Sequence, residues 1–195
     1  APMEVMLWES NSESPNFHDA NTNEPVVLSV PNPAGAQSMV VTFGYFDAGN
    51  DWWWAIDNIT VAIGEPQPAL VPASEGFSSL VLGPNVDEEL AGDAVWTKTA
   101  PSGWSIDDSG VPGVGNPALD GVTEWAGWSF ADKDWWAEAT GDQRRSEFTK
   151  ASGTIAIADG DEWDDQDHAE GYLDTFMSWP LDVSGVSGAL ELRFD

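Results

Sequence analysis

Carboxylates crowd one stretch of this chain. Six of the nine residues in 159–167, DGDEWDDQD, are acidic. At neutral pH such groups repel one another unless a cation or water separates them. Spaced aspartate oxygens on a glycine-containing loop suit Ca²⁺, although their order does not follow the EF-hand loop, and the alternative is a solvated acidic turn. The predicted calcium ligands in this stretch are Asp159, Asp161, Asp164, Asp165 and Asp167.

Paired carboxylates can also hydrolyse glycosidic bonds. Retaining glycosidases need a general acid and a nucleophile on one face of a strand, about 5 Å apart. Glu162, Asp164 and Asp167 match this requirement loosely, but the third carboxylate is an aspartate and the flanking residues favour a loop. The chain has neither a G-x-S-x-G elbow nor a phosphate-binding loop. The sequence therefore predicts a protein without catalytic activity.

Tryptophan is the second unusual component. The chain has twelve, three of them consecutive. Flat aromatic faces can stack on sugar rings, or they can pack into a core or a subunit interface. Because neighbouring strand residues point to opposite sides, at least one side of the triplet is expected to face the core. The predicted ligand or interface aromatics are Trp52, Trp53, Trp54, Trp135 and Trp136.

The charge balance excludes several partners. Acidic residues number 34 and basic residues 6, which gives a net charge of −28. This charge repels phosphate backbones and anionic lipid, so we expect no nucleic acid and no membrane among the partners. There is no cysteine, and the two histidines, His18 and His168, make a weak case for zinc. Arg144 and Arg145 lie among acids and are expected to form ion pairs.

Strands dominate the expected structure. Alternating and β-branched runs predict them, and Gly, Pro, Asn and Asp fill the spaces between. The region 100–150 has few strand patterns but five tryptophans, which indicates long ordered loops pinned by aromatic rings, and one helical turn fits 87–91. The expected strands are Glu4–Glu9, Val26–Val30, Ser38–Phe46, Trp53–Ile63, Phe77–Leu82, Thr154–Ala158, Tyr172–Trp179 and Ala189–Phe194.

Four segments resemble one family. GNDWWWAIDNITV (49–61) resembles the closing strands of MAM-like and concanavalin-like jelly-roll domains of secreted bacterial proteins, and EGFSSLVLGP (75–84) is similar to their first strand. GWSIDDSGVPGVG (103–115) and DGVTEWAGWSFADKDWW (120–136) resemble a large-loop subtype found as an accessory module beside other exported domains. The resemblance implies an all-β jelly-roll sandwich with long Trp-rich loops.

The resemblance also implies a structural cation. In the family, an aspartate of the closing strand and a glutamate just after the first-strand Phe often bind it. Asp57 occupies the first position, whereas Ser78 follows Phe77 and the nearest glutamate is Glu75. Asp57 and Glu75 are therefore added to the predicted Ca²⁺ ligands, and Ca²⁺ is the only cofactor that the sequence indicates.

The order of these segments is permuted relative to one domain. Residues 1–66 correspond to the C-terminal half of a sandwich, 67–74 form a Pro-rich linker, and 75–195 correspond to the N-terminal part with its long loops. Half a sandwich leaves a bare apolar face and an unpaired edge. The other half of the chain, a neighbouring copy, or the next repeat of a tandem array could complete it.

These observations predict an extracellular or cell-surface protein. The expected function is a non-catalytic structural or adhesive β-sandwich that assembles with copies of itself, head to tail, by strand-edge complementation. The alternative is a carbohydrate-binding accessory module of a larger secreted enzyme, with polysaccharide as partner. The two differ in a visible feature, because a sugar binder needs exposed aromatic rings on an open surface.

Overall fold

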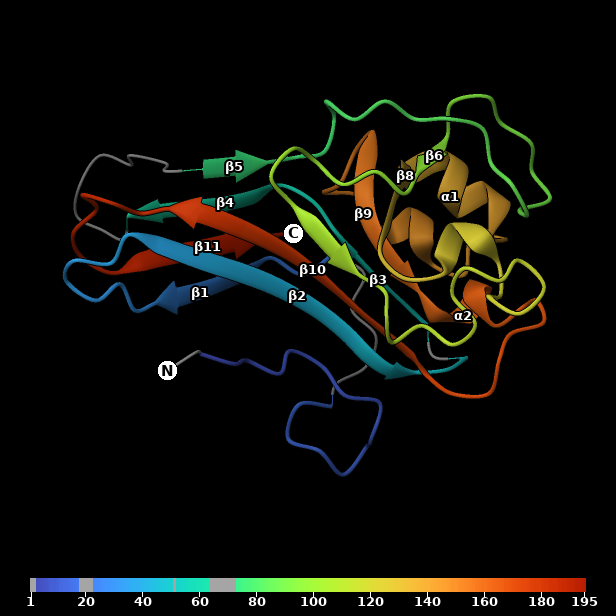
Figure 1. Cartoon of the computed structure of the whole chain (residues 1–195), viewed down its shortest axis with the longest axis horizontal. Coiled ribbons are helices and arrows are strands. Elements are labelled where there is room, and N and C mark those ends of the chain that lie inside the picture. The colour runs from blue at the N-terminus through green and yellow to red at the C-terminus, as the bar shows by residue number, and fades with distance from the viewer. Residues whose placement is uncertain (1–2, 18–22, 51, 64–72) are drawn as a thin grey trace.

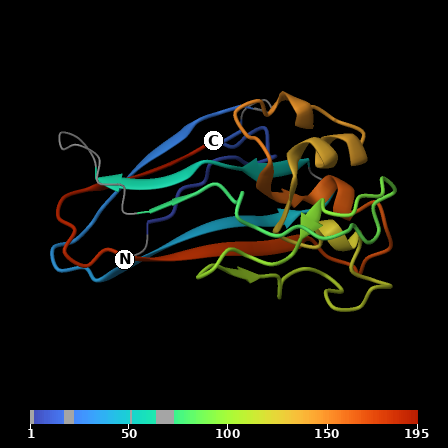
Figure 2. The same ribbon diagram turned by 90° about the horizontal axis from the view of Figure 1, so that it is seen from above.

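A computed structural model describes residues 3–17, 23–50, 52–63 and 73–195. The protein is all-β in character, with antiparallel strands and short helices. Long strands form layers along one axis, and the helices gather at one end (Figures 1 and 2). In the described residues, no helix has the length and apolarity needed to cross a membrane.

Three antiparallel sheets build the molecule. The first has the order β1-β11-β4-β5, the second β2-β10-β7, and the third β3-β9-β8-β6. The strands are β1 (Val26–Val30), β2 (Ser38–Ala48), β3 (Trp53–Ile56), β4 (Ile59–Ile63), β5 (Ala73–Glu75), β6 (Trp96–Thr97), β7 (Ser105–Asp107), β8 (Ser129–Asp132), β9 (Thr154–Asp159), β10 (Leu173–Asp182) and β11 (Leu190–Phe194). The helices are α1 (Lys133–Ala139), α2 (Gly160–Trp163) and the 3₁₀ turns η1 (Thr123–Trp125) and η2 (Arg145–Glu147).

One expected strand is divided in two. The sequence predicts a single strand over Trp53–Ile63, but Asn58 has a φ of 54° and the chain separates there into β3 and β4. Asp57 and Asp195 exchange two backbone hydrogen bonds of 3.0 Å at this break. The break therefore passes the chain from the third sheet to the first.

The first core lies between the second sheet and the other two. Strict alternation in β10 buries every second side chain, including Met177 and Trp179. They pack with Phe43, Ile56 and Phe194 from three other strands. Burying each such side chain contributes about 1.5–3 kcal/mol, so together the side chains of this core stabilise the sandwich strongly.

A second core lies on the other side of the third sheet. All six residues of β9 are buried, because one face of the strand meets the first core and the other meets α1, α2 and the loops around them. Trp125, Trp136 and Trp163 are completely buried there. The prediction that aromatic rings pin the region 100–150 is thus confirmed, although this region also contains β7, β8 and α1.

The two halves of the chain complete one another in this structure. β1 pairs with β11, β2 with β10 and β3 with β9, so each of the three sheets joins a strand before residue 64 to one after residue 153. The first core likewise draws its side chains from both halves. Within the single chain, each half therefore supplies strands and core side chains that complete the other.

Some local predictions are wrong. Glu4–Glu9 is not a strand, although Leu7 packs against the first core, and 87–91 forms no helical turn. Phe77–Leu82 is not a strand either. Phe77 has a φ of 53°, and the Glu75 carboxylate accepts hydrogen bonds from the Gly76 and Phe77 amides, which turns the chain.

Other local predictions agree with the structure. The five remaining expected strands appear as β1, β2, β9, β10 and β11, with ends shifted by up to three residues. Of the predicted linker 67–74, residues 67–72 lie outside the described residues, and the last two belong to β5.

Candidate ligand-binding face

The second sheet has one side that faces solvent. Side chains of β10 alternate between the first core and this outer side, and those of β2 and β7 follow the same pattern. We call this side the binding face. Its residues are Ser38, Val40, Thr42, Gly44 and Phe46 of β2, Asp174, Phe176, Ser178, Pro180 and Asp182 of β10, and Ser105 and Asp107 of β7.

Two phenyl rings lie on this face. Phe176 stands opposite Gly44, and its ring covers the glycine so closely that a Cβ there would lie 2.8 Å from Cε1. Phe46 stacks beside it, with ring centroids 6.3 Å apart and planes inclined by 16°. Phe46 is 44% exposed and Phe176 38% exposed. Glycine lets one side of a ring lie on the backbone while the other side meets solvent.

A third exposed ring lies where these strands meet their loops. The Tyr172 ring is 3.5 Å from the position of a Cβ on Gly49, and this residue is 64% exposed. The register between β2 and β10 shifts after Leu173. The Asp174 carboxylate accepts a 2.7 Å hydrogen bond from the Asp47 amide at this irregularity, which fixes the end of the face.

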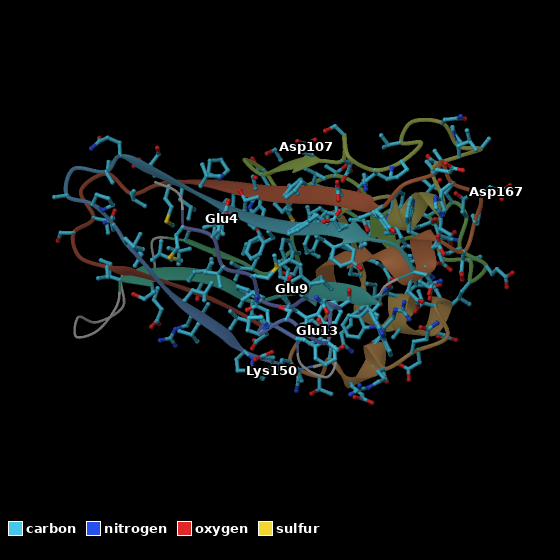
Figure 3. All side chains as sticks on the ribbon, turned by 90° about the horizontal axis from the view of Figure 1, so that it is seen from below. Glu4, Glu9, Glu13, Asp107, Lys150 and Asp167 are labelled. Atoms are coloured by element: carbon cyan, nitrogen blue, oxygen red, sulfur yellow. The ribbon has the colours of Figure 1, made fainter. Side chains whose placement is uncertain are left out.

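Polar groups flank the rings. Thr42 and Ser178 stand opposite each other, with their hydroxyl oxygens 2.9 Å apart. Asp107 stands opposite Phe176 on the other side, at the outer strand of the sheet (Figure 3). Hydrogen bonds from the Ser109 hydroxyl and amide lower the pKa of Asp107, so this carboxylate is ionised at neutral pH.

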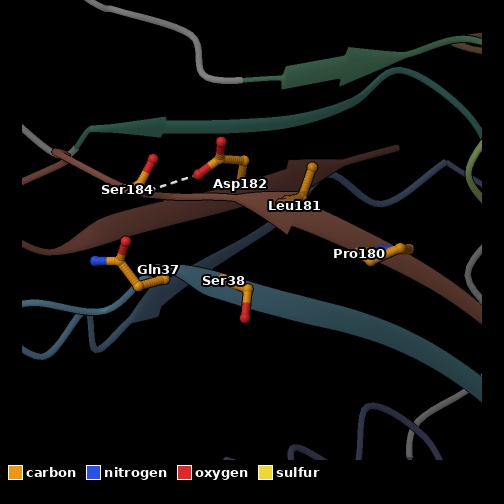
Figure 4. Close-up of a pocket in the computed structure, with 6 residues that line it drawn as sticks. All are labelled: Gln37, Ser38, Pro180, Leu181, Asp182 and Ser184. Carbon is orange, nitrogen blue, oxygen red and sulfur yellow. Dashed lines mark hydrogen bonds between the residues drawn. The ribbon is translucent and has the colours of Figure 1, made fainter.

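An open hollow lies at the other end of the face. It has a volume of about 490 Å³ and is lined by the ends of β2 and β10 (Figure 4). The Asp182 carboxylate accepts a 2.8 Å hydrogen bond from the Ser184 amide, and the Ser184 side chain and amide lower its pKa. The lining residues are Gln37, Ser38, Pro180, Leu181, Asp182 and Ser184.

The acidic stretch 159–167 lies elsewhere, against the second core. Arg145, completely buried, contacts the carboxylates of Asp159 at 2.9 Å, Asp161 at 3.3 Å and Glu162 at 3.1 Å. The Trp136 indole donates a further 2.8 Å hydrogen bond to Asp159. A guanidinium therefore lies against Asp159 and Asp161, two of the five acids in this stretch that the sequence predicts as Ca²⁺ ligands, and the prediction that Arg144 and Arg145 form ion pairs is confirmed.

Burial perturbs the titration of this cluster. It raises the pKa of Glu162 to about 8, assisted by the nearby Asp159 carboxylate and opposed by Arg145. Burial also raises the pKa of Glu88, whose carboxylate accepts a 2.5 Å hydrogen bond from the Trp125 indole. A neutral Glu162 can donate a proton, but its side chain is packed against Arg145 and not presented to solvent.

Asp164 has partners other than Glu162. The His168 ring and the Asp164 carboxylate lie 2.5 Å apart, and the Asn50 amide donates a 3.3 Å hydrogen bond to Asp164. Asp165 and Asp167 are exposed, with Asp167 at the end of the molecule that carries the helices (Figure 3). The loose glycosidase pattern is not assembled by these contacts.

Asp57 and Glu75 both accept hydrogen bonds from backbone amides. Asp57 is buried, which raises its pKa, and it accepts hydrogen bonds from the Asn58 and Ser152 amides. Glu75 accepts its two bonds within the turn described above. Over the described residues, no group of three or more His, Cys, Asp or Glu is arranged to hold a metal ion. Calcium binding stays a prediction of the sequence.

The predicted tryptophans divide between surface and interior. Trp52 is 46% exposed, whereas Trp54 packs on Trp128 in the first core. Trp53 meets the buried Trp136 edge to face, and Trp135 is buried as well.

The sequence interpretation missed Phe46 and Phe176 as surface aromatics. The alternation that it used was sufficient to find them. In the strand expected over Ser38–Phe46, alternation puts Val41 and Phe43 on one side and Phe46 on the other, and the same rule places Phe176 opposite Met177.

Comparison with known proteins gives no match. No family model, no curated protein and no solved structure matches this chain.

Proposed function

We propose that this chain is an exported, non-catalytic β-sandwich of the jelly-roll class that binds polysaccharide through the binding face. The observation that carries the proposal is the pair of exposed, nearly parallel rings of Phe46 and Phe176, the latter lying directly on the backbone of Gly44. Ligand sites typically combine apolar surfaces with a few fixed polar groups. Here Asp107 and the Thr42–Ser178 hydroxyl pair supply those groups.

The arrangement suits a sugar chain for a physical reason. A pyranose ring presents a face of C–H groups, which stacks on an aromatic ring, and an edge of hydroxyls, which need acceptors and donors. The Phe176 ring lies on Gly44 and the Phe46 ring stacks beside it. Because both rings are already ordered, little conformational entropy is lost when a ligand covers them. Glu162, the group whose pKa is raised most clearly, lies on α2 and not on this face.

The experiment compares two phenylalanines of equal exposure. Phe176 and Phe17 are each 38% exposed, but Phe17 lies in the N-terminal segment, outside the three sheets. Affinity electrophoresis through gels containing soluble polysaccharides should retard the wild-type protein. Phe176→Ala should weaken binding about tenfold, as expected for loss of a central aromatic contact, and Phe17→Ala should leave it unchanged. Equal behaviour of the two variants, or no retardation on any polysaccharide, would contradict the proposal.

A second candidate, assembly of copies through a strand edge, is favoured by one observation. β2 is an outer strand of its sheet. The Val183 amide donates to the Gln37 carbonyl, so in the alternating antiparallel ladder the backbone groups of Ser38, Val40 and Thr42 point away from β10. Such an edge can pair with another strand. Negative-stain electron microscopy of concentrated protein tests this: filaments support edge pairing, and dispersed monomers contradict it.

A further inference from the structure

Every lysine and arginine side chain of this protein is engaged in an ion pair. The chain has six of them, and each forms an ion pair with a carboxylate. None of the six lies on the binding face, where the charged residues are acidic. The pairs are Lys98–Asp108, Lys133–Asp134, Arg144–Glu147, Arg145–Asp159, Lys150–Asp195 and Arg193–Glu191.

Carboxylates lie toward both ends of the binding face. Asp107 stands opposite Phe176, and Asp174 precedes that ring by two residues on the same side of β10. Asp182 lies at the hollow, eight residues further along the strand. At roughly 3.3 Å per residue, the run from Asp174 to Asp182 is about 26 Å long. A ligand that meets both ends is a chain of several units, extended along the strands.

Two carboxylates of the binding face, Asp107 beside the rings and Asp182 at the hollow, keep their charge. Bonds from Ser109 lower the pKa of Asp107, and bonds from Ser184 lower the pKa of Asp182. The Asp107 side chain retains Oδ2 for a ligand, because both bonds from Ser109 go to Oδ1. Carboxylates beside aromatic faces are the groups that attract an ammonium ion, through charge and through cation–π contact.

We infer, given the polysaccharide-binding function proposed above, that the ligand is a linear oligosaccharide carrying free amino groups, laid along β2 and β10. Its sugar rings stack on Phe46 and Phe176, and its ammonium groups pair with Asp107 and Asp174 at one end and with Asp182 at the other. Oligosaccharides bearing carboxylate or sulfate are repelled by the same face.

The experiment uses two ligands with one backbone. Isothermal titration calorimetry compares a β-1,4-linked glucosamine hexamer with its fully N-acetylated counterpart, at a pH where the amine is protonated. We expect the amine form to bind about tenfold more tightly in 50 mM NaCl, and this advantage to shrink in 500 mM NaCl because exposed ion pairs are screened.

Two variants separate the parts of the site. Asp107→Asn should weaken the amine hexamer about threefold, as expected for one exposed ion pair, and leave the acetylated hexamer unchanged. Phe176→Ala should weaken both. Asp93→Asn removes one exposed carboxylate from the loop before β6 and serves as the charge-matched control, for which no change is expected.

Other outcomes would contradict either the amino-sugar inference or the proposed polysaccharide-binding function. Equal affinity for the two hexamers, both sensitive to Phe176→Ala, contradicts the amino-sugar inference and leaves polysaccharide binding intact. Competition by polylysine that does not depend on Phe176 shows recognition of positive charge alone and contradicts the inference. Binding of neither hexamer, nor of a neutral or acidic polysaccharide, contradicts the proposed function itself.

Discussion

Of the three arginines in this chain, Arg145 is the one without exposure to solvent. Its guanidinium contacts three carboxylates and lies 5.5 Å from the centre of the Trp136 ring. Buried charges of this kind are stable only while paired, because removing one partner leaves the others uncompensated. The cluster therefore ties η2 and α2 to the end of β9.

Arg145→Met should destabilise the protein by about 3–5 kcal/mol, since Asp159 would lose its cation inside the core. The neighbouring Arg144 pairs with Glu147 at the surface, and Arg144→Met should cost less than about 1 kcal/mol. Urea denaturation followed by tryptophan fluorescence measures both. Similar losses for the two variants would show that the buried cluster has no special weight.

Glu162 links stability to pH. Its pKa is about 8 in the folded protein and ordinarily 4.5, so between these values the folded state holds a proton that the unfolded state releases. Stability should therefore fall as pH rises from about 4.5 to about 8, and Glu162→Gln should flatten that decline. Urea midpoints at pH 5, 6.5 and 8 provide the check. A midpoint that increases over this range, or a slope unaffected by the substitution, would contradict the assignment.

The residue types of this cluster could be predicted, but their pairing could not. The sequence indicates that the acids of 159–167 need a cation and that Arg145 needs an acid. It gives no reason to join the two, because the folded positions of η2, α2 and the end of β9 determine which charges meet. Ca²⁺ was the simplest cation to infer from the acids alone, whereas Arg145 fills that role for Asp159 and Asp161.

At the scale of elements, α1 depends on the residue that precedes it, Asp132. The Asp132 side chain accepts hydrogen bonds from the Asp134 and Trp135 amides, two of the four that a helix start leaves without partners. Asp132→Ala should lower the free energy of unfolding by about 1 kcal/mol. Glu138→Ala, on the exposed side of the same helix, should change it by less than about 0.5 kcal/mol. Equal effects on the urea midpoint would contradict the capping role.

The short elements α1 and β6 were not predicted, because their sequence patterns are too short to recognise. α1 has seven residues, too few for a 3.6-residue pattern to stand out, and β6 has two. Long strands such as β2 and β10 alternate over many residues, and their patterns predicted them correctly. Phe77–Leu82 shows the opposite error, because an apolar run that anchors a turn in the core resembles a short strand.

At the scale of the whole molecule, a net charge of −28 opposes folding through self-repulsion. Added salt should therefore raise the melting temperature. Between 0.01 and 0.1 M NaCl the screening length falls from about 30 to about 10 Å, so most of the rise should occur there. Differential scanning calorimetry checks this. If CaCl₂ at equal ionic strength gave a further rise that Asp57→Asn removed, the calcium prediction would gain support.

The all-β class of the fold was more predictable than the pairing of distant strands that completes its sheets. Strand patterns and Gly- and Pro-rich spacers predicted an all-β protein, which the structure confirms. The permuted order of segments raised the question of what covers each half, and local patterns cannot answer it. The answer depends on contacts between residues more than a hundred positions apart, such as Val26 with Phe194.

The place of β11 has a consequence for biosynthesis. This strand, residues 190–194, lies between β1 and β4 and contributes Leu190, Leu192 and Phe194 to the first core. While a ribosome is still adding these residues, β1 and β4 have no neighbour to hold them together. The nascent protein therefore cannot complete the first sheet until nearly all of the residues described here have been synthesised. Closure then comes as one late event, slowed by the long loops that it joins.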